Sequence, residues 1–125
     1  MGSRKVLVVD DVTEQRDITA TLLRHHGYEV LEAAGGEEAV RICRECQPDM
    51  IILDMMMSAP DGWAVTDLLK HDALTSPIPI IALTVSHTEE DKERARIAGA
   101  DSYLIKPCFP ATVLEEVQRF IGPAI

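Results

Sequence analysis

The 125-residue sequence has no apolar run near the ~20 residues that a helix needs to span a bilayer. The apolar stretch closest to its start, Val6–Val9, is also too short for the hydrophobic region of a secretory signal peptide. These absences argue against a membrane-spanning or exported protein. A cytoplasmic location is therefore the default expectation.

Cysteine is scarce, with only Cys43, Cys46 and Cys108. An odd number in a chain long enough to bury an ordinary core does not indicate a disulfide framework. Cys43 and Cys46 form a Cys-x-x-Cys pair, but no second pair or spaced histidine pair completes a zinc site. On a helix the two would lie one turn apart, so we expect them to be small packing residues on one face.

Positive charge is in short supply, because 12 lysines and arginines face 21 aspartates and glutamates, for a net charge of −9. A protein this acidic is repelled by phosphate backbones and by anionic membranes. We therefore expect neither nucleic acid nor a membrane as a direct partner. The acidity serves solubility, and it also fits a cation site or basic protein partners.

Short apolar runs are present and predict the strands of a sheet. Val6–Val9, Met50–Leu53, Ile80–Leu83 and Tyr103–Ile105 each stop abruptly at a polar residue. Such runs indicate strands buried on both faces, as in a parallel sheet. The segment Tyr28–Ala33 alternates more between polar and apolar residues, which suits an edge strand.

Segments with helical periodicity lie between and after these runs. Gly27 and Gly99 are expected to stop two of the helices, and Thr88-Glu-Glu-Asp91 is a start signal with acids at the positive end of the helix dipole. The apolar positions that share a helix face are Ile18, Leu22 and Leu23; Ala39, Val40, Cys43 and Cys46; Val65, Leu68 and Leu69; and Val113, Leu114, Val117, Phe120 and Ile121. Strand and helix thus alternate five times. This predicts one α/β domain with a doubly wound, five-stranded parallel sheet and five helices.

Polar residues stand where the predicted strands end. Asp10 and its neighbour Asp11, Asp54, Thr84 and Lys106 stand just after the apolar runs. Ligands of open α/β sheets bind in the crevice outside the carboxyl ends of the strands. Taken singly, these residues have ordinary explanations as helix caps, loop acids or surface charges. Because those explanations would have to hold independently at every strand end, we expect one common site.

The residue types at this site point to phosphoryl chemistry. Like charges ~4 Å apart repel by about 4 kcal/mol at an effective dielectric of about 20, so three carboxylates need protonation or a bound cation. Oxygen ligands without nearby His or Cys, and with positions left for water, favour Mg²⁺ over Ca²⁺. Lys106 adds a second positive charge and Thr84 a hydroxyl donor. Such a set stabilises a phosphoryl group in transfer, with one carboxylate as the nucleophile.

From Lys5 to about Phe120, this pattern resembles the receiver domain of bacterial two-component response regulators, close to the chemotaxis regulators. The resemblance implies the flavodoxin-like strand order 2-1-3-4-5. It implies a single receiver domain over residues 4–122, with no output domain in this chain.

The resemblance also implies the metal ligands and the acceptor. Asp54 would be the phosphoacceptor. Mg²⁺ would be held by Asp11, by Asp54 and by the backbone carbonyl of Met56, with Asp10 acting through water. Mn²⁺ is expected to substitute for Mg²⁺.

The remaining matches imply how the site responds. Thr84 and Lys106 would contact the phosphoryl oxygens, and Tyr103 would swing inward as the Thr84 loop closes. Pro107 completes the Lys-Pro pair of the family, whose peptide bond is commonly cis. Val85 departs from the family, which usually has a small residue there, and its branched side chain is expected to restrict access to the phosphoryl group.

The implied function is a switch in a phosphorelay. A sensor histidine kinase or a histidine phosphotransfer protein donates the phosphoryl group, and the altered surface acts on a downstream protein target or output domain. The receiver catalyses its own phosphorylation and hydrolysis and turns over no separate substrate, so it is not expected to be an enzyme in the usual sense. The family also allows a homodimer on phosphorylation.

Two other classes of function fit the sequence less well. The alternative is a degenerate receiver that acts as a phosphorylation-independent docking module, against which the full acidic set argues. The other class is a different flavodoxin-like enzyme or flavin carrier, or a phosphatase with an Asp-x-Asp nucleophile motif, and the sequence argues against each. Asp10-Asp11 repels phosphate without a metal, Gly35-Gly36 lacks the Gly-Lys-Ser/Thr of a P-loop, and Asp54-Met55-Met56 lacks a second acid.

Overall fold

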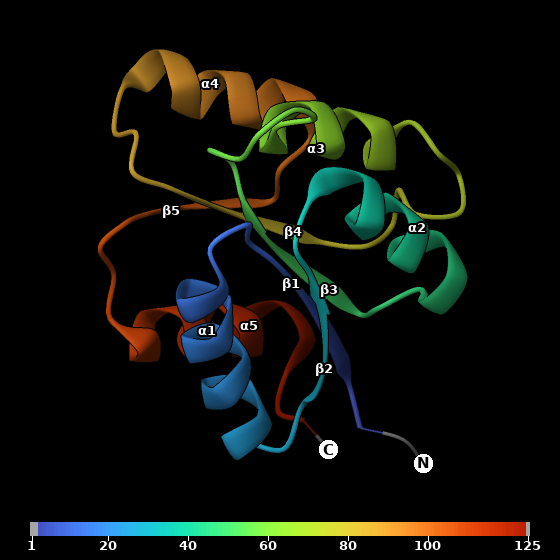
Figure 1. The fold of residues 1–125 in the computed structure, drawn as a ribbon, viewed down its shortest axis with the longest axis vertical. Coiled ribbons are helices and arrows are strands. Elements are labelled where there is room, and N and C mark those ends of the chain that lie inside the picture. Colours follow the sequence, from blue (N-terminus) through green and yellow to red (C-terminus); the bar gives the residue numbers. More distant parts are fainter. Residues whose placement is uncertain (1–2, 125) are drawn as a thin grey trace.

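A five-stranded parallel sheet lies between two layers of helices in the computed structural model, which describes residues 3–124 (Figure 1). In chain order the elements are β1 (Lys5–Val9), α1 (Thr13–His25), β2 (Glu29–Ala33), α2 (Gly36–Cys46), β3 (Met50–Asp54), α3 (Gly62–Lys70), β4 (Ile80–Thr84), α4 (Glu89–Ala98), β5 (Ser102–Ile105) and α5 (Pro110–Ile121). The strand order is β2-β1-β3-β4-β5. This confirms the predicted fold class and strand order.

The register of the sheet brings the polar strand ends to one edge. Val9 pairs with Leu53, so the residues that follow β1 lie level with the end of β3. Asp54 in turn pairs with Leu83, and Thr84 pairs with Ile105. Asp54 and Thr84 are the last residues of β3 and β4, so each of these strands extends one residue beyond the apolar run that predicted it.

Two apolar cores form because the side chains of each strand alternate between the faces of the sheet. One core lies under α2, α3 and α4, and the other lies under α1 and α5. Every residue of β3 and of β4 is buried. The inner strands are thus covered on both sides, as their uniformly apolar sequences predict.

Three helix positions that were expected to pack are exposed. Ile18 is 61% exposed and Leu68 is 55% exposed, and Cys46 at the end of α2 also faces solvent, although Cys43 is buried. In α3, Thr66 is buried instead of Leu68, and its hydroxyl donates a hydrogen bond to the Gly62 carbonyl at 2.8 Å. Periodicity identifies residues that share a face, but the neighbours that cover the face decide burial.

Helix α4 begins and ends as predicted. The Thr88 hydroxyl accepts a hydrogen bond from the Asp91 N–H, and Gly99 ends the helix with a left-handed backbone. Ala95 is the buried residue of this mostly charged helix. Little apolar surface therefore anchors α4 to the rest of the protein.

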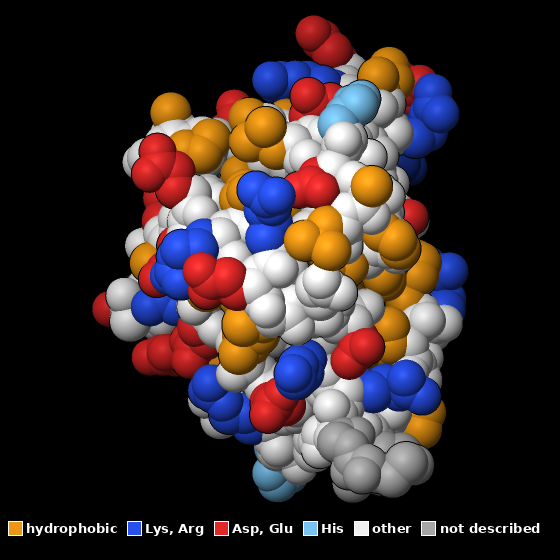
Figure 2. Space-filling view, turned by 90° about the vertical axis from the view of Figure 1, so that its right-hand side faces the viewer, with side chains coloured by type: hydrophobic (Ala, Val, Ile, Leu, Met, Phe, Trp, Pro, Cys, Tyr) orange, Lys and Arg blue, Asp and Glu red, His pale blue; other side chains and the backbone are white. Residues whose placement is uncertain are grey.

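The surface charge is mixed on the side where α2 and α3 lie. Acidic and basic side chains are interspersed there, with separate apolar patches between them (Figure 2). Arg44 on α2 pairs with Asp72 at 3.1 Å, and Arg41 pairs with Glu45 one turn along the same helix. Within residues 3–124, each helix is too short or too polar to pass through a lipid bilayer.

Candidate functional site

Three carboxylates meet at the carboxyl end of the sheet. One oxygen from each of Asp10, Asp11 and Asp54 lies within 4.8 Å of the other two. Asp10 and Asp54 are buried, with 6% of each residue exposed, whereas Asp11 is open to solvent. The ends of β1 and β3 therefore bring together the acids that the sequence pattern placed in one site.

The backbone after each strand fixes two of these carboxylates. Oδ1 of Asp10 accepts a hydrogen bond from the Val12 N–H at 2.9 Å. Oδ1 of Asp54 accepts one from the Met56 N–H at 3.1 Å in the same way. Such bonds to the N–H two residues on are typical of aspartates in turns. They hold both side chains in place, so that Oδ2 of Asp10 and Oδ1 of Asp54 face the Lys106 ammonium.

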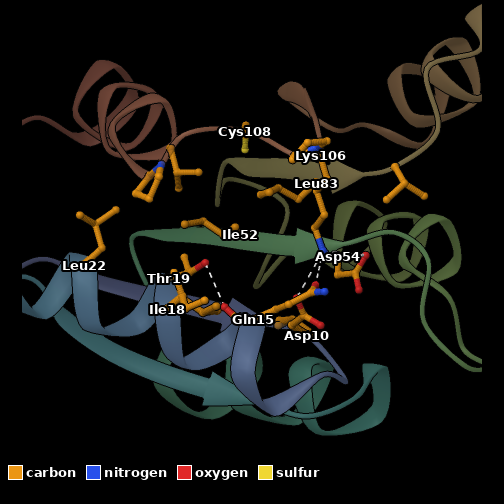
Figure 3. Close-up of a pocket in the computed structure, with 16 residues that line it drawn as sticks. Asp10, Gln15, Ile18, Thr19, Leu22, Ile52, Asp54, Leu83, Lys106 and Cys108 are labelled. Carbon is orange, nitrogen blue, oxygen red and sulfur yellow. Dashed lines mark hydrogen bonds and ion pairs between the residues drawn. The ribbon is translucent and has the colours of Figure 1, made fainter.

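Lys106 supplies the positive charge of the site (Figure 3). Its Nζ lies 3.4 Å from Oδ2 of Asp10 and 3.7 Å from Oδ1 of Asp54, and it donates a hydrogen bond to Oε1 of Gln15 at 2.9 Å. Its backbone N–H bonds the Thr84 carbonyl at 2.7 Å, which joins the end of β5 to the end of β4. One ammonium thus lies against two of the three carboxylates.

The surroundings of Asp54 disfavour its negative charge, which a bound cation would offset. Burial raises the pKa of its carboxyl, and the charges of Asp10 and Asp11 raise it further. The Met56 N–H and the Lys106 ammonium oppose this by lowering the same pKa. The carboxylate oxygens, with no His or Cys among them, form a donor set that fits a hard divalent ion.

Thr84 is completely buried and is the start of a hydrogen-bond chain. Its Oγ1 accepts from the Ser86 N–H at 3.1 Å, and the Ser86 carbonyl accepts from the Tyr103 hydroxyl at 2.9 Å. Burial also raises the pKa of Tyr103. The Ser86 hydroxyl donates to Oδ2 of Asp91 at 2.6 Å, in the first turn of α4. Tyr103 is therefore already anchored to the loop that follows Thr84.

The other predicted residues surround this centre. The Lys106–Pro107 peptide bond is cis, as the resemblance implied. The Met56 side chain is 51% exposed, and its backbone reaches Asp54 through the N–H. Val85 is 59% exposed and lines the same hollow as Asp54 and Lys106.

Sequence reasoning missed three contributors to the site. Gln15 bonds Lys106, and Arg16 donates to the Asp10 carbonyl at 2.8 Å and to Glu32 at 3.3 Å. Ser86 links Thr84, Tyr103 and α4. Gln15 and Arg16 lie in the first turn of the helix that follows the acidic pair. This position in the sequence could have identified them as neighbours of the site. Ser86 lies two residues after Thr84. Nothing in the sequence indicates that its main chain bonds Thr84 and Tyr103 while its hydroxyl bonds Asp91.

Comparison with known proteins gives a consistent result. Residues 6–118 match the model of the response regulator receiver domain. Protein PilH of Pseudomonas aeruginosa is 38% identical over 119 residues, which cover 94% of this chain and 98% of PilH. The phosphate regulon transcriptional regulatory protein PhoB of Klebsiella pneumoniae is 36% identical over 124 residues, which cover 97% of this chain and 54% of PhoB. The chain therefore spans about half the length of that regulator.

A solved structure with a metal ion is also similar. The receiver domain of the sensor histidine kinase PA1611 from Pseudomonas aeruginosa PAO1 superposes with a TM-score of 0.88 at 32% identity. The match covers 98% of this chain and 99% of that one. That crystal structure has a magnesium ion coordinated in its active site cleft.

Proposed function

The chain belongs to the response regulator receiver domain family of two-component signalling, and from this premise we propose that it accepts a phosphoryl group on Asp54. The donor is a phosphohistidine of a sensor histidine kinase or of a histidine phosphotransfer protein. The observation that carries the proposal is the placement of Lys106 against two buried carboxylates, Asp10 and Asp54, beside the exposed Asp11.

The acceptor chemistry follows from the way Asp54 is held. Its Oδ1 is engaged by the Met56 N–H and faces Lys106, so Oδ2 is the oxygen that attacks phosphorus. A P–O bond forms at this oxygen as the P–N bond to the donor imidazole breaks, and the imidazole nitrogen keeps the electron pair. The Lys106 ammonium and the Thr84 hydroxyl stabilise the charge on the phosphoryl oxygens.

The residues at the site fit Mg²⁺, and Mn²⁺ is expected to substitute. Asp11, Asp54 and the Met56 carbonyl would hold the ion directly, and Asp10 would hold it through water. When bound, the ion supplies positive charge that neutralises the carboxylates and the incoming phosphoryl oxygens. The buried carboxylates of Asp10 and Asp54, which have one lysine between them, support this assignment.

Phosphorylation would be transmitted through the loop after β4. The new charge draws the Thr84 hydroxyl toward Asp54, and Thr84 is bonded to the Ser86 N–H. Ser86 is bonded in turn to Tyr103 and to Asp91, so the same movement reaches β5 and the first turn of α4. The surface formed by α4, β5 and α5 is the element that switches.

The partners follow from this role. The phosphodonor binds at the Asp54 end of the sheet, and a downstream protein target or output domain reads the α4–β5–α5 surface. We assign residues 4–122 to one receiver domain that acts as a switch without a separate substrate and without direct contact with nucleic acid or membrane. A homodimer on phosphorylation is part of the proposal. The docking-module alternative is not favoured, since the acidic set and the lysine are all present.

Intact-mass spectrometry after incubation with acetyl phosphate and Mg²⁺ tests the proposal. The native protein should gain one phosphoryl group, and chelation of the metal should prevent the gain. Asp54→Asn should gain none, whereas the control Asp17→Asn, which alters an exposed acid of α1, should behave as the native protein does. A folded native protein that binds Mg²⁺ but stays unmodified with both acetyl phosphate and a phosphohistidine donor would leave the docking module as the function.

A further inference from the structure

The Lys106 ammonium lies among three acceptors that come from three different elements (Figure 3). Oε1 of Gln15 on α1 accepts its hydrogen bond at 2.9 Å, whereas Oδ2 of Asp10 lies at 3.4 Å and Oδ1 of Asp54 at 3.7 Å. Of these three contacts, the one with Gln15 falls within the usual range of about 2.7–3.2 Å for an N–H···O hydrogen bond. The nearest of the three partners is therefore a neutral amide and not a carboxylate.

The main chain of Lys106 is fixed, but its side chain is long. The Lys106 N–H donates to the Thr84 carbonyl at 2.7 Å, which ties the start of this side chain to the end of β4. A lysine side chain has considerable rotamer freedom, which it loses when its ammonium is held in one place. The acceptors around Nζ therefore decide where the positive charge lies.

Gln15 belongs to a helical turn that is itself bonded to the site. The Val12 N–H donates to Oδ1 of Asp10 at 2.9 Å, and Arg16 donates to the Asp10 carbonyl at 2.8 Å. Arg16 also bonds Glu32 of β2 at 3.3 Å. Gln15 lies between Val12 and Arg16 in the chain, so the base of its side chain is fixed relative to the end of β1.

The absence of charge on the Gln15 amide affects what the lysine can do. An amide oxygen accepts one of the three ammonium protons and adds no negative charge to the site. Without Gln15, the ammonium would move toward Asp10 and Asp54, because these carboxylates would be its remaining partners among the three. A closer ion pair with Asp54 would cover the acceptor and oppose a cation beside it.

We propose that Gln15 is a positioning residue for phosphoryl transfer, which holds the Lys106 ammonium beside Asp54 and prevents it from pairing closely with the acceptor. Gln15 acts on the reaction through Lys106. A charge that is already in place when the phosphoryl group arrives requires no rearrangement at that moment. The effect on phosphorylation rests on the function proposed above, whereas the effect on the position of the lysine does not.

Two substitutions of Gln15 should change magnesium binding in opposite directions. Gln15→Met keeps the length of the side chain but removes the acceptor, so Lys106 moves toward the carboxylates and Mg²⁺ should bind about threefold more weakly. Gln15→Glu draws the lysine away and adds a negative charge, so Mg²⁺ should bind about threefold more tightly. A merely structural disturbance of α1 would not give shifts of opposite sign.

Both substitutions should slow phosphorylation by acetyl phosphate, by about tenfold for the loss of one hydrogen bond to a charged group. In Gln15→Met the lysine pairs with the acceptor, and in Gln15→Glu it is drawn away from the phosphoryl oxygens. In the Lys106→Met protein, Gln15→Met should change neither the rate nor the affinity for Mg²⁺ any further. Thr21→Met places the same side chain at another exposed position of α1 and should match the native protein. Circular dichroism checks that each variant is folded.

The side-chain amide of Gln15 reports the contact directly by NMR. In metal-free, ¹⁵N-labelled protein its NH₂ resonances are assigned by their loss in Gln15→Met. They should shift in Lys106→Met, which removes the ammonium, and should stay in place in Lys92→Met, which alters an exposed lysine of α4.

The outcomes separate this role from the proposed function. Opposite shifts in magnesium affinity, together with a Gln15→Met effect that disappears in Lys106→Met, support the positioning role. Equal affinities in native protein, Gln15→Met and Gln15→Glu, a Gln15→Met effect that persists in Lys106→Met, or an amide resonance that Lys106→Met does not move would each overturn it. A native protein that shows the amide shift and the opposite magnesium effects but is never phosphorylated would overturn the proposed function and still support the hold of Gln15 on Lys106.

Discussion

Lys106 approaches Asp54 to 3.7 Å between Nζ and Oδ1, although Asp54 ends β3 and Lys106 follows β5, and these strands are not neighbours in the sheet. The contact spans β4, which lies between β3 and β5. Lys106 also lies 3.4 Å from Asp10, and its side chain is only 20% exposed. This single ammonium therefore offsets part of the repulsion between Asp10 and Asp54, and it lies next to the acceptor.

Replacing this lysine should have opposite effects on metal binding and on phosphorylation. Lys106→Met removes a positive charge that repels Mg²⁺, so the protein should bind the ion more tightly. The same change removes the ammonium that stabilises the phosphoryl oxygens, so phosphorylation by acetyl phosphate should slow by roughly 100-fold. Titration with Mg²⁺ and the time course of intact mass measure the two effects. Lys92→Met, an exposed change on α4, should alter neither, and a parallel loss of both in Lys106→Met would contradict this role.

The raised pKa of Asp54 predicts how stability depends on pH. Because the folded-state pKa lies above the ordinary value of 3.8, the folded protein favours the protonated carboxyl, and stability falls as pH rises through that folded-state pKa. Asp54→Asn removes this loss of stability, because the amide does not ionise. In metal-free buffer at neutral pH the variant should melt at a higher temperature than the native protein, and the difference should close as the pH falls below the ordinary value.

Magnesium should reverse that order of stability. A ligand that binds only the folded protein stabilises it by about 2.7 kcal/mol at roughly 100 times its dissociation constant. Mg²⁺ should therefore raise the melting temperature of the native protein and of the control Asp17→Asn much more than that of Asp54→Asn. Equal stabilisation of all three by Mg²⁺ would place the ion elsewhere.

Val85 should slow both the gain and the loss of the phosphoryl group. Its side chain lines the hollow that contains Asp54 and Lys106, so it limits the approach of a donor and of water. Val85→Ala should speed phosphorylation by acetyl phosphate and subsequent hydrolysis by several-fold. The melting temperature should hardly change, because the side chain is 59% exposed. Unchanged rates in a folded variant would show that Val85 does not restrict access.

Two adjacent glycines should differ sharply in their tolerance of alanine. A Cβ at Gly36 would lie 2.6 Å from Cγ of Pro60 and 2.7 Å from Cγ2 of Val65, whereas a Cβ at Gly35 would meet nothing within 4 Å. Gly36→Ala should destabilise the protein by about 1–3 kcal/mol through overpacking, and Gly35→Ala should be neutral. Denaturant unfolding measures both, and equal stability of the two variants would contradict the packing of α2 against the loop after β3.

The fold and the centre of the site could be predicted because both depend on where apolar runs end. Val6–Val9 and Met50–Leu53 are strands on account of their composition, and parallel order brings Asp10 and Asp54 to the same edge. The caps of α4 could be predicted because Thr88 and Gly99 act through their own backbone neighbours. Each of these features is local in the chain.

The remaining features depend on contacts between distant elements. The exposure of Ile18 depends on how the neighbouring elements pack around α1. The bond from Lys106 to Gln15 depends on the direction that a side chain after β5 takes toward α1. The connection of Ser86 to Tyr103 and to α4 is likewise set by the path of the loop after β4. Periodicity and strand-end position do not specify such directions.

The identity of the modified residue tests the central claim most directly. The protein is phosphorylated with acetyl phosphate and Mg²⁺, reduced with sodium borohydride, digested and sequenced by mass spectrometry, because the reduction converts an aspartyl phosphate to homoserine. The account predicts homoserine in place of Asp54, only in the sample that received both reagents. Homoserine in place of Asp10 or Asp11, or a phosphoester on a hydroxyl side chain with Asp54 unchanged, would contradict it.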